Sequence, residues 1–120
     1  MPSSNPVQRL DDILENIDRI RRYTKGMDET SFENDIKTID AVERCFQRIA
    51  EAALKLGDQF DEEYPMLDLP ALRGFGSVLR HDYDSIQPVL LWGFVQKRLG
   101  PMEKMAQQEI QNLSGDLPLQ

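Results

Sequence analysis

The chain has 120 residues, of which 40% are hydrophobic and 29% charged, and its formal net charge is −7. This length and balance favour one globular domain with its own apolar core and exclude a disordered chain. The acidic surplus excludes a surface that binds nucleic acid everywhere, because such binding depends on cations that neutralise phosphates. We expect one domain over residues 1–120, with residues 1–5 and 114–120 frayed.

Two further features bear on location and redox state. No segment approaches the ~18 consecutive apolar residues of a membrane span. The start, Met-Pro-Ser-Ser-Asn-Pro, lacks the basic and apolar regions of a signal peptide. We therefore expect a cytoplasmic protein with no membrane partner. Cys45 is the one cysteine, and its place in an apolar helical pattern indicates a buried thiol.

A first helix is predicted from Pro6 to just before Gly26. Residues 3–5 (Ser-Ser-Asn) form a capping cluster, and proline suits the first helical position. Apolar residues then recur at threes and fours on one stripe: Val7, Leu10, Ile13, Leu14, Ile17 and Ile20.

A second helical region is predicted from a capping box at Thr30 and Glu33 to Gly57. Few globular helices run this long unbroken, so we expect a bend or a separate first turn near residue 35. No segment alternates apolar and polar residues between turn signals, so no strand is expected.

A third helix is predicted from Leu69, with Asp68 as its cap, to His81 or slightly short of it. It contains Gly74 and Gly76, each of which costs about 1 kcal/mol relative to alanine in a helix. Such glycines usually mark the close approach of another backbone or a ligand.

A final helix is predicted to begin near Pro88, to be interrupted at residues 100–101 (Gly-Pro) and to continue to Leu113. Taken together, these elements predict an all-α, up-and-down bundle of four to six helices.

Chemically reactive groups concentrate in residues 73–85. His81 is the one histidine; Arg80 precedes it directly and Tyr83 follows two residues later. A structural interpretation is a helix C-terminus, where cationic side chains are electrostatically favoured. A chemical interpretation is a general acid or base beside an arginine that binds phosphate, which can cleave RNA at the 2′-hydroxyl without a metal. Both interpretations stay open on these residues alone.

The sequence lacks the residues that other kinds of catalytic site require. One histidine and one cysteine without clustered acids predict no metal site, and we expect no cofactor. Ser77 stands four residues before His81 and faces it on a helix, but no nucleophile elbow or oxyanion loop accompanies it. The pair Gly74 and Gly76 lacks the third glycine and the preceding strand of a phosphate-binding loop.

A local basic site is compatible with the acidic balance. Cations placed around one groove would attract a phosphate backbone. The residues considered are Arg73, Arg80, Lys97, Arg98 and Lys104.

The chain resembles the HepT-like branch of the HEPN proteins from Leu10 to about Ile110. The residues that carry the resemblance are 42–56, Tyr64-Pro65 and 69–83, which ends in His81-Asp82-Tyr83. The His-x-Tyr ending after an arginine-containing helix is its most specific element. The resemblance implies an all-helical homodimer whose active members are metal-independent ribonuclease toxins, encoded beside a minimal nucleotidyltransferase antitoxin.

The resemblance also implies residue roles. His81 matches the catalytic histidine, and Tyr83 matches the tyrosine that the antitoxin modifies with AMP. The family pattern places an arginine at position 76, where this chain has Gly76; Ser77 keeps the polar position that follows. The nearest arginines, Arg73 and Arg80, are the candidate substitutes.

Two function classes follow from this departure. In the first, the protein is a ribonuclease toxin whose paired His81 residues face one cleft across a dimer, with a displaced arginine at each site. In the second, it has lost cleavage and is a binding module for RNA, a nucleotide or its nucleotidyltransferase partner. The first is the favoured hypothesis.

Overall fold

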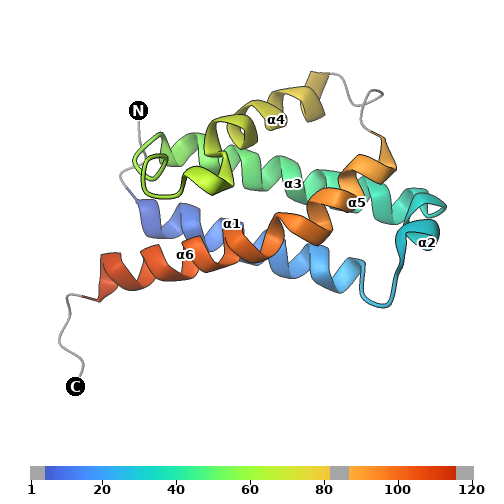
Figure 1. The fold of residues 1–120 in the computed structure, drawn as a ribbon, viewed down its shortest axis with the longest axis horizontal. Helices are drawn as coiled ribbons and strands as arrows, with labels where there is room; N and C mark the ends of the chain where they lie inside the picture. The colour runs from blue at the N-terminus through green and yellow to red at the C-terminus, as the bar shows by residue number, and fades with distance from the viewer. Residues whose placement is uncertain (1–4, 82–86, 116–120) are drawn as a thin grey trace.

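The computed structural model describes residues 5–81 and 87–115, except for the side chains of Arg80 and His81. Every regular element in these ranges is helical, which confirms the all-α bundle. The elements are α1 (Pro6–Tyr23), α2 (Glu29–Glu33), α3 (Ile36–Leu56), the 3₁₀ helix η1 (Pro65–Leu67), α4 (Leu69–His81), α5 (Pro88–Lys97) and α6 (Leu99–Ser114). Helix α1 packs on α3 and α6, and α3 also packs on α4 (Figure 1). The long helices therefore form a layered bundle in which α3 separates α1 from α4.

Helix α1 begins as the sequence predicts. The Asn5 side chain accepts a hydrogen bond from the Gln8 backbone N–H at 3.2 Å, and Pro6 is the first helical residue. The chain leaves the helix through Gly26, which has a left-handed φ of 78° that glycine adopts without strain. The buried side of the helix contains the predicted apolar stripe: Leu10, Ile13, Ile17 and Ile20.

The predicted break near residue 35 is confirmed, but the predicted capping box is wrong. Helix α2 is a separate short element, and Asp35 caps α3 through a 3.1 Å bond from the Thr38 N–H. The capping box pairs Asp28 with Ser31, whose N–H donates to the Asp28 carboxylate at 2.8 Å. Because Asp28 is already extended after the turn at Gly26, the helix starts before Thr30 can cap it.

The final helical region is interrupted two residues earlier than predicted. Helix α5 ends at Lys97, and Arg98 joins it to α6, so Gly100 and Pro101 belong to the first turn of α6. A proline is tolerated there because the first backbone N–H groups of a helix have no intrahelical partner. Its ring is incompatible with a helix continuing through the preceding turn, which accounts for the break at Arg98.

The core lies between the helices and is mostly aliphatic and aromatic. Cys45 is 1% exposed inside it, and burial raises the pKa of its thiol, in agreement with the predicted buried cysteine. Within the described ranges, no helix is both long enough and apolar enough to cross a membrane.

One buried polar contact ties the loop before η1 to α6. The Tyr64 hydroxyl donates to a carboxylate oxygen of Glu109 at 2.5 Å, and Glu109 is only 4% exposed. Asn112 donates to the other carboxylate oxygen at 3.4 Å. Burial and the hydrogen bond to Glu109 raise the pKa of Tyr64 to about 12. The phenol therefore stays protonated and keeps the carboxylate paired.

Candidate functional site

Helix α4 carries the predicted catalytic segment and has one buried and one exposed side. Gly76 and Leu79 are buried, whereas Gly74 and Ser77 are exposed. His81 is the last residue of the helix and follows Ser77 by four positions, which places the two on one face by helical register. The structure thus confirms the helix and its end at His81.

Arg73 is held by the loop that follows α3. Its guanidinium forms a two-pronged ion pair with Asp61, at 2.9 and 2.7 Å, and also donates to the Gly57 carbonyl at 3.1 Å. Both side chains of the pair are about four-fifths buried, at 18% and 21% exposure. The hydrogen bonds from Arg73 lower the pKa of Asp61. Both terminal nitrogens of Arg73 are therefore engaged, and the pair fixes the start of α4 against the end of α3.

The two glycines of α4 differ in their surroundings. A methyl group added to Gly74 would meet no atom within 4 Å, so no neighbour in the described chain requires a glycine there. The close approach expected at Gly74 is therefore not made within the single described chain. Gly76 lies on the buried side of the helix.

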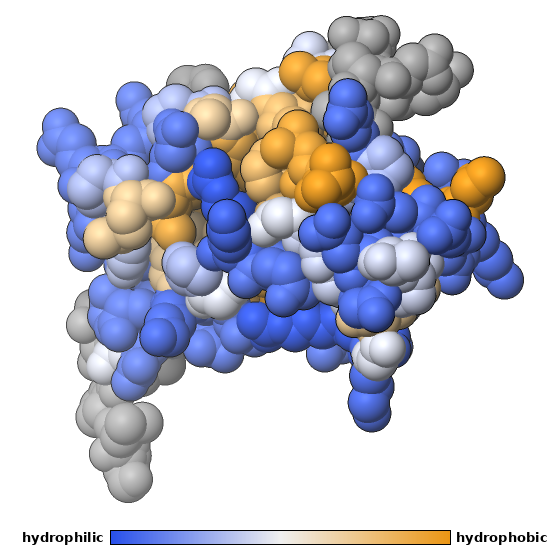
Figure 2. Space-filling model, turned by 45° about the vertical axis from the view of Figure 1, so that its right-hand side comes forward, coloured by the Kyte–Doolittle hydropathy of each residue, from blue (hydrophilic) through white to orange (hydrophobic). Residues whose placement is uncertain are grey.

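An apolar groove of about 440 Å³ runs beside α4, between it and α5 and α6. Phe46, Phe75 and Phe94 pack edge to face at its base, with ring centroids 5.1 to 6.3 Å apart. Figure 2 shows hydrophobic residues gathered along the upper part of this face, at the height of α4 in Figure 1. We use "the apolar groove" for the surface lined by Phe46, Leu67, Ala71, Leu72, Gly74, Phe75, Val78, Phe94, Arg98 and Met102.

The predicted cations are only partly brought together. Arg98 lines the apolar groove, with its guanidinium 5.7 Å from the centre of the Phe94 ring and a 2.9 Å hydrogen bond to the Leu67 carbonyl. Lys97 and Arg98 border a neighbouring hollow on α5. Arg73 faces Asp61 instead of the groove. The side chain of Arg80 and all of Tyr83 lie outside the described part of the structure.

Two parts of the site were not anticipated from the sequence. The partner of Arg73, Asp61, is twelve residues away in an irregular segment, where no periodic pattern predicts a contact. The apolar groove combines three phenylalanines from three helices, and in the sequence each of them alone is typical of a core residue. Among the residues described, no three or more His, Cys, Asp or Glu side chains form a group that could hold a metal ion.

The described elements form a helical bundle, and the one histidine of the sequence is the last residue of α4. The protein is therefore a small all-α domain with a candidate site on a helix. Within that class, the family described as "Ribonuclease HepT-like" matches residues 13–109, which include nearly all of the bundle. The chain belongs to the HepT-like ribonuclease family.

Similar proteins occur in Methanocaldococcus jannaschii. The chain is 30% identical over 115 residues to the protein named "Putative RNase MJ1216", covering 96% of this chain and 95% of that protein. It is also 30% identical over 113 residues to "Putative RNase MJ0125", covering 94% and 97%. No solved structure shows a significant match to the chain.

The ion pair between Asp61 and Arg73 leads to a stability prediction. Asp61→Asn is expected to lower the free energy of unfolding at pH 7 by about 1 kcal/mol, since the pair is partly buried but keeps contact with water. Because the folded-state pKa of Asp61 is lowered, the ion pair adds its full contribution to the free energy of unfolding above the ordinary aspartate pKa of about 4. It is lost as the pH falls through the lowered value.

Urea unfolding of wild type and variant at pH 7 and at pH 3 measures this difference. Glu62→Gln is the matched control, because Glu62 is an exposed carboxylate next to Asp61 in sequence. Equal stability of the two variants at pH 7 would show that the ion pair contributes nothing.

Proposed function

We propose that this protein is a metal-independent endoribonuclease and the toxin of a toxin–antitoxin pair. The observation that carries the proposal is the end of α4 at His81, one turn after the exposed Ser77, in a chain of the HepT-like ribonuclease family. The names of two relatives from Methanocaldococcus jannaschii point to the same substrate class.

In the proposed reaction, His81 takes the proton of a ribose 2′-hydroxyl as a general base. The 2′-oxygen then attacks the adjacent phosphorus, and the bond to the 5′-oxygen of the next nucleotide breaks with return of a proton to that oxygen. A guanidinium stabilises the negative charge that develops on the phosphate. Ser77 contributes a hydroxyl one turn before His81 that can orient the phosphate.

Arg80 is the stronger candidate for the guanidinium. Positions 73, 76 and 80 share one stripe of α4, because they are separated by three and four residues. Arg80 therefore lies one turn after the family's arginine position, and Arg73 lies one turn before it. Arg73 has to leave Asp61 to reach a phosphate, and this cost disfavours Arg73.

The binding-module hypothesis remains the second candidate, because one observation favours it. With Gly76 at the family's arginine position and Arg73 paired with Asp61, two of the three arginine positions on the stripe supply no available guanidinium. In this alternative the protein binds RNA, a nucleotide or its nucleotidyltransferase partner without cleaving RNA.

We further propose a homodimer that forms through the apolar groove. Val78 on α4 is 39% exposed at the groove, and Val89 and Leu90 on α5 are 45% and 49% exposed. The open space beside Gly74 gives a second helix room to approach α4 closely. A two-fold axis at this face would bring the ends of both α4 helices, and so both His81 residues, toward one cleft.

Tyr83 is the proposed point of control. An adenylyl group on its hydroxyl places a charged phosphate two residues from His81, where it would repel the phosphate of an RNA substrate. The minimal nucleotidyltransferase antitoxin proposed as the partner would transfer this group from ATP, with pyrophosphate as the leaving group.

Cleavage of a structured RNA in the presence of EDTA tests the catalytic roles. His81→Ala is expected to lower the rate at least about 100-fold, because general acid–base catalysis contributes on this scale. Arg80→Ala is expected to lower the rate about tenfold, a smaller loss than removal of a fully aligned cation would cause.

Gly76→Arg is expected to raise the rate. Its uncharged control, Gly76→Gln, tests whether bulk alone at this buried position has an effect.

Asp61→Asn separates the two roles open to Arg73. If Arg73 reaches the phosphate, Arg73→Ala lowers the rate whereas Asp61→Asn, which frees the guanidinium, does not. If Arg73 only fixes the loop, both variants lose activity in proportion to stability. Absence of EDTA-resistant cleavage in both wild type and Gly76→Arg contradicts the enzyme proposal and supports the binding module.

The dimer is tested by sedimentation equilibrium at micromolar concentration. Val78→Asp is expected to shift the protein to monomers, because it places a charge in an apolar interface. Gly74→Ala is expected to stabilise the helix by up to about 1 kcal/mol while weakening the dimer. Leu113→Asp on α6 is the control, with a similarly exposed apolar side chain (45%) outside the apolar groove. A monomeric wild type rules the dimer out.

Adenylylation is tested by incubating the protein with the nucleotidyltransferase encoded beside it and ATP. Intact-mass spectrometry is expected to show added AMP on wild type, loss of the addition in Tyr83→Phe, and slower RNA cleavage by the modified protein. The same mass on Tyr83→Phe assigns the modification to another residue.

A further inference from the structure

A polar cleft of about 330 Å³ lies between α1 and α3. We call this surface the polar cleft; its lining consists of the cations Arg9, Arg19, Arg48 and Lys55, the carboxylates Asp12, Glu15 and Glu51, and Asn16 and Ala52. It opens on the α1 side of α3, whereas α4 packs on another side of α3 (Figure 1). The cleft is therefore separate from the helix that carries His81.

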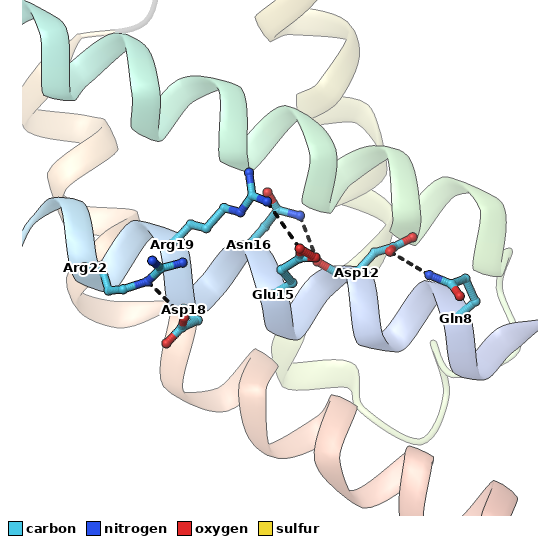
Figure 3. Close-up of polar contacts among 7 residues, drawn as sticks. All are labelled: Gln8, Asp12, Glu15, Asn16, Asp18, Arg19 and Arg22. Atoms are coloured by element: carbon cyan, nitrogen blue, oxygen red, sulfur yellow. Dashed lines mark hydrogen bonds and ion pairs between the residues drawn. The ribbon is translucent and has the colours of Figure 1, made fainter.

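Asn16 provides a buried acceptor in the polar cleft. Its side chain is 6% exposed and projects from α1 toward α3 (Figure 3). The amide nitrogen donates to the Asp12 carbonyl at 2.8 Å, and a carbonyl only accepts, so this bond fixes which end of the amide is oxygen. Within the described chain the amide oxygen has no hydrogen-bond partner. Such a group weakens the fold unless a partner from outside satisfies it.

Arg9 provides an unpaired donor on the same helix. Its Nε is buried and has no partner among the described residues. Arg9 and Asn16 are seven residues apart, so they lie two turns apart on one face, about 10 Å along the axis. Their spacing fits an extended ligand that accepts a hydrogen bond at one end and donates one at the other.

The polar cleft is lined by four cations and by three carboxylates, Asp12, Glu15 and Glu51, so its lining carries a surplus of one positive charge. Arg9 pairs with Asp12 at 3.3 Å and Arg19 pairs with Glu15 at 3.3 Å, so these cations are already balanced. Arg48 and Lys55, by contrast, are exposed and have no ion-pair partner in the described ranges. They are seven residues apart on α3 and therefore share one face.

We propose that the polar cleft binds the ribose-phosphate backbone of single-stranded RNA at a point away from the catalytic helix. Phosphates pair with Arg48 and Lys55, and a ribose 2′-hydroxyl donates to the Asn16 amide oxygen. RNA supplies both groups in every nucleotide, whereas DNA lacks the donor. The proposal rests on the proposed function in that RNA is the substrate.

Arg19 is a further cation that a phosphate in the polar cleft can contact. Arg19 and Asn16 both line the polar cleft, and both side chains extend toward α3 in Figure 3. Arg19 is held by an ion pair to Glu15 in which the two side chains are 37% and 57% exposed, and such surface pairs are weak. A phosphate that pairs with Arg19 in place of Glu15 would lie in the same cleft as Asn16.

Binding is measured in the His81→Ala background, so that cleavage does not interfere. The probes are a fluorescent single-stranded RNA, the DNA of the same sequence, and free AMP as competitor. Replacing both Arg48 and Lys55 by glutamine is expected to weaken RNA binding about tenfold at low salt. The slope of log binding constant against log salt concentration should also become shallower by about 1.4, which is about 0.7 for each lost phosphate contact. The control replaces Lys25 and Lys37, two exposed cations outside the polar cleft, by glutamine and makes the same change in net charge.

Asn16→Leu separates a ligand role from a structural one. The preference for RNA over DNA is expected to fall about fivefold, the factor for one neutral hydrogen bond. The melting temperature should hold or rise, because leucine leaves no unpaired polar group. A lower melting temperature with an unchanged RNA preference overturns the assignment of Asn16.

Three other outcomes overturn the RNA site. They are equal loss of binding in the control and cleft variants, equal affinity of wild type for RNA and DNA, and binding of free AMP without binding of RNA. These results are independent of catalysis: absence of EDTA-resistant cleavage by the wild type refutes the catalytic proposal but leaves the binding test of the polar cleft intact.

Discussion

Burial of α3 from more than one side is the constraint on which the structure depends. Its apolar residues contact α1 on one side and α4 on another, so its burial contributes to both halves of the bundle. Phe46 illustrates this dual role, because it is 1% exposed in the core and also forms part of the base of the apolar groove. The hydrophobic effect that stabilises the bundle therefore also fixes the surface beside the candidate catalytic helix. A surface of this kind is rigid because the core beneath it is close-packed.

Polar contacts then set the position of α4 more finely than apolar packing can. Hydrophobic contacts lack direction, whereas the two-pronged pair between Arg73 and Asp61 requires one orientation of the helix start relative to the loop. An arginine on the stripe that includes the family's arginine position has thus become part of the scaffold. The ion pair with Asp61 thus holds the start of α4 while it occupies the Arg73 guanidinium.

The sequence predicts the helices well because their signals are local. Each of these signals acts within a few residues. They are Asn5 before Pro6, the glycines at 26 and 57, and the three-to-four spacing of apolar residues in α1 and α3. Errors arose where two local signals compete, as at Asp28 and Thr30, or where a proline is read as a break when it begins a helix, as at Pro101. The contacts of Arg73 could not be predicted, because they depend on the distance between segments that are separated in the chain. The unpaired amide oxygen of Asn16 could not be predicted either, because it depends on the exact depth of burial. The assignment of His81 depends on the family resemblance, because its spacing alone favours a helix C-terminus.

The bond between Tyr64 and Glu109 has a consequence for local unfolding. It joins the irregular segment before η1 to the last turns of α6, although the two residues are 45 positions apart. Opening either segment alone would leave a buried carboxylate or phenol without its partner, which disfavours partial opening. The two segments should therefore behave as one cooperative unit in hydrogen exchange, with backbone amides of the loop and of the end of α6 protected to a similar degree. Motion near the start of α4 is in this way coupled to the C-terminal helix.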